Sequence, residues 1–318
     1  MTCEVEERIH KALAPHPLER TEDGYCLKHP GGAGVSRLRI RPVAAPAPES
    51  TLVATVDVIA EYAPLGLPSF HAAGIERLNA MAVYGAYHLV EGRLTQRAQF
   101  SLYSVDATPH LSTQMILDVF GRQLPIGRSV AAAIVSASAT EQQRALHGLP
   151  GDWSERLPEE QLRTTAEALR ARGIAAASDA NSIWAEFALS GDVPSRTIDP
   201  KAETALLQLH AGMLHPVAGA GYLATIMLPF ATRPADPVAV CGRLNAAEFD
   251  LLDFVPRMGA WGLHGPNDLP GYSCFIPCGK PYGAMHSALM WGCVQRASWI
   301  RQRHWAAGEG VVFGEAAA

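Results

Sequence analysis

The sequence has little positive charge, and its Lys and Arg residues are dispersed. Charged residues make up 18% of the 318 residues, the formal net charge is −5, and no run of Lys and Arg is longer than two. A nucleic-acid-binding surface usually carries clustered Lys and Arg, so this composition argues against nucleic acid as a partner. The 48% of hydrophobic residues is enough for sizeable cores, and the length predicts two domains.

The sequence also lacks the features of secretion and of a membrane span. Glu4, Glu6 and Glu7 stand where a secretory signal peptide would have a basic segment followed by an apolar core. Residues 204–232 contain no Asp, Glu, Lys or Arg, but His, Gln, Pro and Gly interrupt them. We therefore expect two buried strands joined at His215–Pro216 and no membrane contact. A cytoplasmic protein of bacterial type is the resulting expectation.

Cysteine is sparse, with six residues scattered along the chain, which predicts buried or free thiols in a reducing compartment. Cys274, Cys278, His286 and Cys293 form the densest group of possible metal ligands. His286 and Cys293 are seven residues apart on a predicted helix, about 10 Å, which is too far for one tetrahedral zinc ion. We expect no metal site and no structural zinc. The alternative, a metal or active site in the His/Cys-rich second half that also uses His210 and His215, stays open.

Complete catalytic motifs are lacking as well. Residues 219–224 match the loose dinucleotide pattern GxGxxA, but a strand with Pro229 follows where the pattern requires a helix. The sequence contains no GxSxG and no HExxH motif. We therefore expect no cofactor and no catalytic residues, with an enzyme as the alternative.

Hydrophobic spacing supplies most of the predicted elements. In Ser36–Val43, Leu38 and Ile40 alternate with three arginines, which predicts a half-buried strand with a cationic outer face. Helices are predicted over residues 4–13, 72–84, 112–124, 129–146, 158–172, 237–253 and 284–305. Strands are predicted over residues 25–28, 36–43, 52–62, 87–90, 94–103, 183–189, 205–211, 222–230, 261–263 and 272–276.

One short block occurs twice. Arg77-Leu78-Asn79-Ala80 recurs as Arg243-Leu244-Asn245-Ala246, each time on the predicted helix after a long strand. Gly85-Ala86-Tyr87 and Gly259-Ala260-Trp261 follow the two copies. This repeat predicts a duplication and an α+β fold. The two α-β-β-β-α-β-β-α units would cover residues 1–147 and 158–318, joined by a linker over 148–157.

The order of elements, with Leu78-Asn79 and Leu244-Asn245 on a helix before a strand pair, resembles YbjN-like proteins, which share the type III secretion chaperone-like fold. The resemblance implies two antiparallel sheets with helices on one face, packed as an internal pseudo-dimer. It also implies a protein-binding or chaperone-like role without catalysis. Under this interpretation Leu78, Asn79, Leu244 and Asn245 are candidates for the interface between the units.

A protein partner is expected at the second unit, because the loop between its last two strands, His264–Gly271, is longer than the Glu91-Gly92 turn of the first. The last helix, rich in Trp and Arg, is either a core helix or part of this interface. A structural subunit of a larger assembly is a further possibility. The partner-binding candidates are Trp261, His264, Asn267, Asp268, Trp299 and Arg303.

Overall fold

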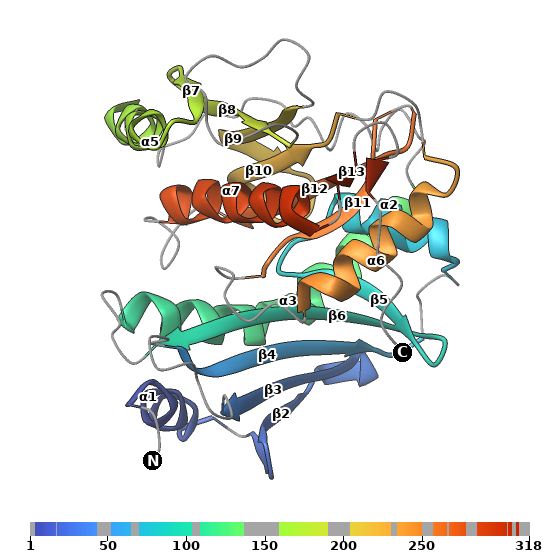
Figure 1. Ribbon diagram of the computed structural model, residues 1–318. Coiled ribbons are helices and arrows are strands. Elements are labelled where there is room, and N and C mark those ends of the chain that lie inside the picture. Colours follow the sequence, from blue (N-terminus) through green and yellow to red (C-terminus); the bar gives the residue numbers. More distant parts are fainter. Residues whose placement is uncertain are drawn as a thin grey trace.

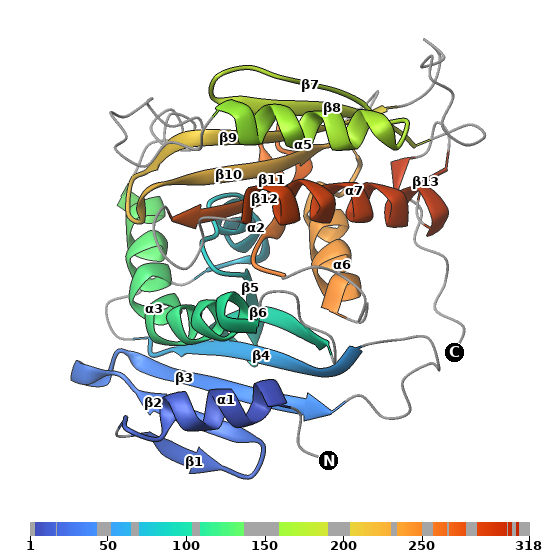
Figure 2. The same ribbon diagram turned by 90° about the vertical axis from the view of Figure 1, so that its left-hand side faces the viewer.

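The computed structural model contains two six-stranded antiparallel sheets, one from each half of the chain (Figures 1 and 2). The predicted α+β class is confirmed. The structure describes residues 4–16, 18–42, 52–64, 70–103, 109–136, 159–189, 204–229, 234–249, 257–265, 267–277, 285–303, 305–306 and 310–311. The predicted linker, residues 148–157, lies outside them.

The first half builds one sheet with the strand order β1-β2-β3-β4-β6-β5. Helices α1 and α3 cover one face of this sheet (Figure 2). The elements of this half are α1 (Glu4–Leu13), β1 (Glu19–Thr21), β2 (Gly24–Lys28), β3 (Gly34–Pro42), β4 (Leu52–Tyr62), α2 (Ala72–Ala80), β5 (Ala86–Val90), β6 (Arg93–Tyr103) and α3 (Pro109–Ser136).

The second half builds a sheet with the order β7-β8-β9-β10-β12-β11, which is the same order counted from the start of the half. Helices α5 and α7 cover one face of it (Figure 2). The elements are α5 (Glu159–Ala171), β7 (Ala175–Ser178), β8 (Ser182–Ala188), β9 (Thr204–His215), β10 (Gly219–Met227), α6 (Pro237–Phe249), β11 (Ala260–His264), β12 (Leu269–Pro277) and α7 (Met285–Arg303), followed by β13 (Trp305–Ala306) and β14 (Gly310–Val311).

Alternating side chains decide which face of each sheet is buried. On β3, Leu38 and Ile40 are buried under the helices, and the three arginines point to the other face, as predicted. The inward side chains of both halves belong to one continuous hydrophobic cluster. Its members include Val56 and Val58 of β4, Phe120 of α3, Leu207 of β9, Ile226 of β10 and Ile300 of α7.

The uncharged stretch 204–232 forms two paired strands, β9 and β10, joined by a turn at residues 216–218. This confirms the prediction of two strands in that stretch. Across the described parts of the chain, none of the helices combines the length and the apolar character needed to cross a bilayer.

One prediction about the first half is wrong. Instead of two helices over 112–124 and 129–146, the single helix α3 continues through Pro125 to Ser136; residues 137–146 lie outside the described part. Proline removes one helical hydrogen bond, but packing outweighs that loss here. Gly127 lies against the Tyr62 hydroxyl, at a distance that leaves no room for a Cβ atom, and its carbonyl accepts a hydrogen bond from Tyr87 Oη.

Four strands were missed, and one loop is shorter than predicted. Two of them, β13 and β14, follow α7: Trp305 lies within the predicted helix 284–305, and nothing is predicted for residues 310–311. The short edge strands β1 and β7 carry no apolar alternation that would reveal them. In the second hairpin, Leu269–Gly271 belong to β12 and pair with Gly262–His264, so the turn covers only residues 265–268. The first hairpin turns at Glu91-Gly92 as predicted, with positive φ angles at both residues.

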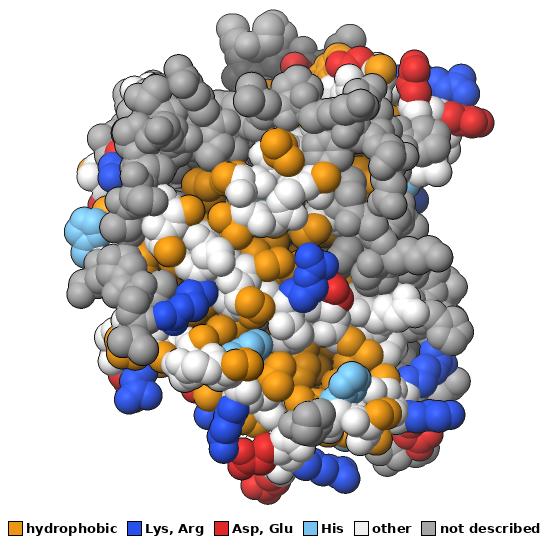
Figure 3. All heavy atoms as spheres, turned by 180° about the vertical axis from the view of Figure 1, so that it is seen from behind, with side chains coloured by type: hydrophobic (Ala, Val, Ile, Leu, Met, Phe, Trp, Pro, Cys, Tyr) orange, Lys and Arg blue, Asp and Glu red, His pale blue; other side chains and the backbone are white. Residues whose placement is uncertain are grey.

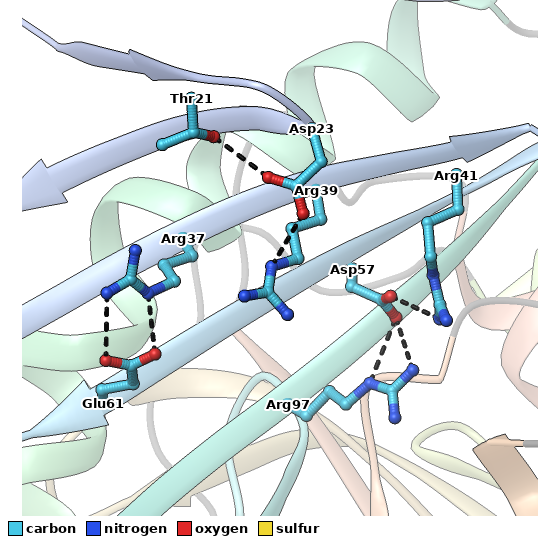
Figure 4. Close-up of polar contacts among 8 residues, drawn as sticks. All are labelled: Thr21, Asp23, Arg37, Arg39, Arg41, Asp57, Glu61 and Arg97. Atoms are coloured by element: carbon cyan, nitrogen blue, oxygen red, sulfur yellow. Dashed lines mark hydrogen bonds and ion pairs between the residues drawn. The ribbon is translucent and has the colours of Figure 1, made fainter.

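Charged side chains are unevenly distributed over the molecule. Figure 3 shows hydrophobic side chains gathered in the middle of the rear face, with most charged side chains toward its edges. Figure 4 shows the outer face of the first sheet, which faces away from α1 and α3 and carries a network of ion pairs. Arg37 pairs with Glu61, and Arg39 pairs with Asp23.

Asp57 is the buried member of this network. Its side chain is 3% exposed, pairs with Arg41 and Arg97, and accepts a hydrogen bond of 3.0 Å from Gln99 Nε2. Glu61, on the same strand, is 39% exposed and pairs with a single arginine. The two carboxylates therefore differ in burial within one ion-pair network.

We expect Asp57→Ala to lower the free energy of unfolding by about 3 kcal/mol or more, because it leaves Arg97 and Gln99 without their shared acceptor in a buried position. Glu61→Ala, the matched control, should cost no more than about 1 kcal/mol. Urea titration of both variants measures the difference. Equal losses would show that burial of Asp57 does not strengthen the network.

Candidate functional site

The two halves meet where α2 and β5 of the first contact α6 and β11 of the second (Figures 1 and 2). Here we call this region the junction. The repeated block lies in it: Leu78 and Leu244 are fully buried, and Asn79 and Asn245 are buried beside them. The structure thus brings the four interface candidates together.

The two asparagines make the same pair of hydrogen bonds in each half. Asn79 Oδ1 accepts from the backbone N–H of Tyr87 at 2.6 Å, and its Nδ2 donates to the Tyr87 carbonyl at 3.2 Å. Asn245 does the same with Trp261, at 2.8 Å for both bonds. Each side-chain amide thereby satisfies backbone groups on the free edge of β5 or β11, which a further strand would otherwise pair.

Glu76 lies between the asparagines, one turn before Asn79 on α2. Its Oε2 accepts hydrogen bonds from Asn79 Nδ2 at 3.1 Å and, across the junction, from Asn245 Nδ2 at 3.4 Å. Burial raises the pKa of Glu76 to about 7, and the bond from Asn79 opposes this only in part. The equivalent position on α6, three residues before Asn245, is Gly242, so one carboxylate serves both halves.

Helix α2 packs directly on the strands of the second half. A Cβ atom at Gly262 of β11 would lie 2.4 Å from the backbone nitrogen of Ala80, so only glycine allows this approach. Ser273 Oγ of β12 donates to the Ala80 carbonyl at 3.0 Å. Gly262 and Ser273 point away from α7, so α2 covers the outer face of the second sheet at its β11–β12 end.

The halves also exchange backbone contacts at equivalent positions. Val83 of the first half bridges Phe275 on β12, and Arg257 of the second half bridges Gln99 on β6. Val83 lies four residues before Tyr87, and Arg257 lies four residues before Trp261, the residues that Asn79 and Asn245 bind. One bridge is parallel and the other antiparallel, yet each half donates the same segment to the other.

A buried ion pair fixes the second half beside the junction. Glu248 of α6 accepts hydrogen bonds from Arg296 Nε at 2.6 Å and from the indole nitrogen of Trp261 at 3.0 Å. The Arg296 guanidinium lies 4.3 Å from the ring centre of Tyr272. Glu248 and Arg296 side chains are only 4% and 3% exposed, so this cluster belongs to the core.

The partner-binding candidates are distributed differently from the sequence expectation. Trp261 is fully buried, and Trp299 is 6% exposed within the hydrophobic cluster. Both are core residues, so neither can anchor a partner without local opening; the core interpretation of the last helix holds for Trp299. Arg303 lies at the end of α7, and its side chain is outside the described part of the structure.

The second hairpin turn carries the remaining candidates. His264 is partly exposed at the end of β11, Asn267 is exposed, and Asp268 is partly exposed. Asp268 pairs with Arg77 of α2 at 3.4 Å. The turn is therefore attached to the first half, and its Asn267 is the candidate most available to solvent.

The His and Cys residues do not converge. His215 is buried at the junction, where its Nε2 lies 3.2 Å from the Met81 carbonyl, and burial lowers its pKa to about 4. His210 stands on the outer face of β9 and His286 on α7, while Cys278 lies outside the described residues. Cys274 and Cys293 are free buried thiols whose pKa burial raises to about 12. Within the described ranges, no three His, Cys, Asp or Glu side chains are placed to hold a metal ion.

The raised pKa of Glu76 makes junction stability depend on pH. The Glu76 carboxyl stays protonated in the folded state up to about pH 7, whereas it ionises near pH 4.5 in the unfolded state. The stability that this difference contributes is fully present below pH 4.5 and is lost as the pH rises through about 7. Glu76→Gln cannot ionise. We therefore compare the free energy of unfolding of this variant with that of the native protein. The difference, variant minus native, should increase by up to about 3 kcal/mol between about pH 5 and pH 8.

Urea titrations at several pH values test this, with Glu167→Gln on the exposed face of α5 as the control. A difference between Glu76→Gln and the native protein that is the same at all pH values would contradict a titrating Glu76.

Two glycines at the junction give opposite expectations for the same substitution. Gly262→Ala should destabilise the protein by about 2 kcal/mol or more, because the new Cβ collides with backbone atoms of α2. Gly242→Ala meets nothing closer than Glu76 Oε1 at 3.7 Å, and alanine within a helix should stabilise by about 0.5–1 kcal/mol. Thermal unfolding of both variants measures the two signs. If Gly262→Ala leaves the thermal stability unchanged, α2 is not in close backbone contact with β11.

Comparison with known proteins adds no relative to this picture. No family model, no curated protein and no solved structure matches the chain. The resemblance to YbjN-like proteins therefore stays a prediction, and the function has to be argued from the junction and the two sheets.

Proposed function

We propose that this chain is a non-catalytic protein-binding module of the chaperone-like kind that the YbjN resemblance implies. The observation that carries the proposal is the one-sided covering of the sheets. The long helices α1 and α3 lie on one face of the first sheet, and α5 and α7 lie on one face of the second. Among the described elements, α2 covers only the β11–β12 end of the opposite face of the second sheet. The partly exposed outward side chains of the other strands are therefore candidates for contact with another protein.

The junction supports a role in which the halves act together. The repeated strand order and the equivalent bonds of Asn79 and Asn245 favour a duplicated unit that packs against its own copy. Linking the copies in one chain makes their association independent of protein concentration. Each half can then vary its open sheet face while the other elements keep the pair assembled.

The enzyme alternative has no specific observation in its favour. Thiols such as Cys274 and Cys293, with pKa values raised to about 12, stay protonated and unreactive at neutral pH. The buried Glu248 is occupied by Arg296 and Trp261. These groups are accounted for by packing within the second half.

The proposal is tested by capture followed by reconstitution. The full-length tagged chain is incubated with lysate of its native host, and bound proteins are identified by mass spectrometry. Each is then purified and titrated against the chain by calorimetry. We expect a saturable complex with a defined stoichiometry, displaced from the tagged bait by an excess of untagged chain. Captured proteins that untagged chain does not displace, and that do not bind in the titration, would refute the function.

A further inference from the structure

The open faces of the two sheets can be compared position by position. Tyr87 and Trp261 are equivalent through their asparagines, and they pair with Gln96 on β6 and Tyr272 on β12. Gln96 and Tyr272 are therefore equivalent. Three residues further along β6 and β12, Gln99 is equivalent to Phe275. From there the strand registers extend the equivalence across β4 and β10 and then across β3 and β9.

This comparison shows a loss of charged side chains on β9, β10 and β12 of the second half. Six charged side chains of β3, β4 and β6 have no Asp, Glu, Lys or Arg at the equivalent positions: Arg37, Arg39, Arg41, Asp57, Glu61 and Arg97 correspond to Gln208, His210, Met213, Leu223, Met227 and Ser273. Lys28 at the end of β2 corresponds to Glu186 of β8, so that position keeps a charge. Cys26 on β2, which is buried, corresponds to Trp184 on β8, which is 38% exposed.

We call a set of seven outer side chains of β8, β9 and β10 the neutral face; it consists of Trp184, Leu206, Gln208, His210, Leu223, Thr225 and Met227. Apart from Trp184, all of these residues are partly exposed. Figure 3 shows hydrophobic side chains reaching the surface in the middle of the rear face. Among the described residues of these strands, Glu186 of β8, which pairs with Leu206, is the one Asp, Glu, Lys or Arg side chain on this side.

The neutral face continues an interface that already holds a helix. Helix α2 lies on the same face of the same sheet, over β11 and β12, where Gly262 and Ser273 receive it. A groove lined by Met81, Ala82, Met213, Leu223 and Phe275 connects α2 to the neutral face. Leu223 belongs to both, so the apolar surface is unbroken from the junction to β10.

We propose that the neutral face binds an amphipathic α-helix of a partner protein, which lies beside α2; this rests on the protein-binding function proposed above. Packed helices lie about 8–10 Å apart, and adjacent strands about 4.8 Å apart. A helix one spacing from α2 therefore lies over β10 and β9. Leu223, Met227 and Leu206 contact its apolar side, and Trp184 closes its far border.

The side chains of the neutral face suit such a ligand. Methionine adapts to irregular apolar partners, and an exposed Trp is a common anchor at interfaces. Gln208 supplies hydrogen-bonding groups at the centre without a charge that binding would have to desolvate. A helix on the equivalent face of the first half would bury Glu61 and the partly exposed arginines around it and Asp57, which is costly.

The test uses the full chain and two synthetic amphipathic helical peptides of about 18 residues, one of Leu and Lys and one of Leu and Glu, with scrambled versions that lack the apolar face. We expect both amphipathic peptides to bind, to gain helicity in circular dichroism, and to change tryptophan fluorescence in a way that Trp184→Phe abolishes. Binding equal to that of the scrambled peptides would overturn the proposal.

Variants then locate the site. Leu223→Asp and, at a more exposed position, Trp184→Lys should each weaken peptide binding about tenfold or more. Ile59→Asp on the charged face of the first half is the matched control and should bind as the native chain does. Circular dichroism and thermal unfolding confirm that each variant is folded. Equal affinity of all three variants would place the helix elsewhere.

The outcomes separate this inference from the proposed function. If a partner identified by capture binds Leu223→Asp and Trp184→Lys as tightly as the native chain, the neutral face is refuted while the function stands. If sedimentation shows a dimer of the native chain that Trp184→Lys dissociates, the occupant is a second copy and the partner helix is refuted. If the captured partner loses affinity for both variants, and a peptide from its own helix competes with it, both proposals are supported.

Discussion

The constraint on which this structure depends is the closure of two sheet edges in its interior. β5 and β11 end their sheets at the place where the halves meet, so the outward backbone groups of Tyr87 and Trp261 are buried. Asn79 and Asn245 present one donor and one acceptor each, in the geometry that a neighbouring strand would offer. A buried backbone group without a partner costs about 1–3 kcal/mol. The contacts of α2 with β11 and the exchanged bridges are possible because these edges are satisfied from within.

The junction is symmetric in its backbone and asymmetric in its charge. Glu76 has Gly242 as its counterpart, so one carboxylate accepts hydrogen bonds from the asparagines of both halves. In a homodimer each subunit would bring the same residue, and two buried carboxylates this close would repel. A single chain with two unequal halves removes that repulsion, because Gly242 brings no second carboxylate. Covalent linkage therefore permits a form of the interface that an exact pair could not adopt.

Local patterns in the sequence were sufficient for much of the fold. Alternation placed Leu38 and Ile40 inside and the arginines outside, and the repeated Leu-Asn block identified the helices of the junction. The sequence patterns could not reveal which partner a buried residue has. Trp261 was predicted to be a surface anchor beside a turn, but it lies in the core and donates a hydrogen bond to Glu248. The neutral face was missed because residues 204–232 were judged by length and interruption. Their outward positions, Leu206, Gln208 and Leu223, carried the signal in their lack of charge.

The two open faces show how one scaffold can be given two different surfaces. Covering the face of paired charges would be costly, because it would remove water from Glu61 and from four partly exposed arginines at once. Replacing those side chains by Leu, Met, Gln and His lowers the cost of burial without altering the strands beneath, since the outward positions contribute little to the core. The first half thus keeps its face in water, while the second presents a face that another helix can cover. The two asparagines remain the same in both halves, because they close the sheet edges where the halves meet.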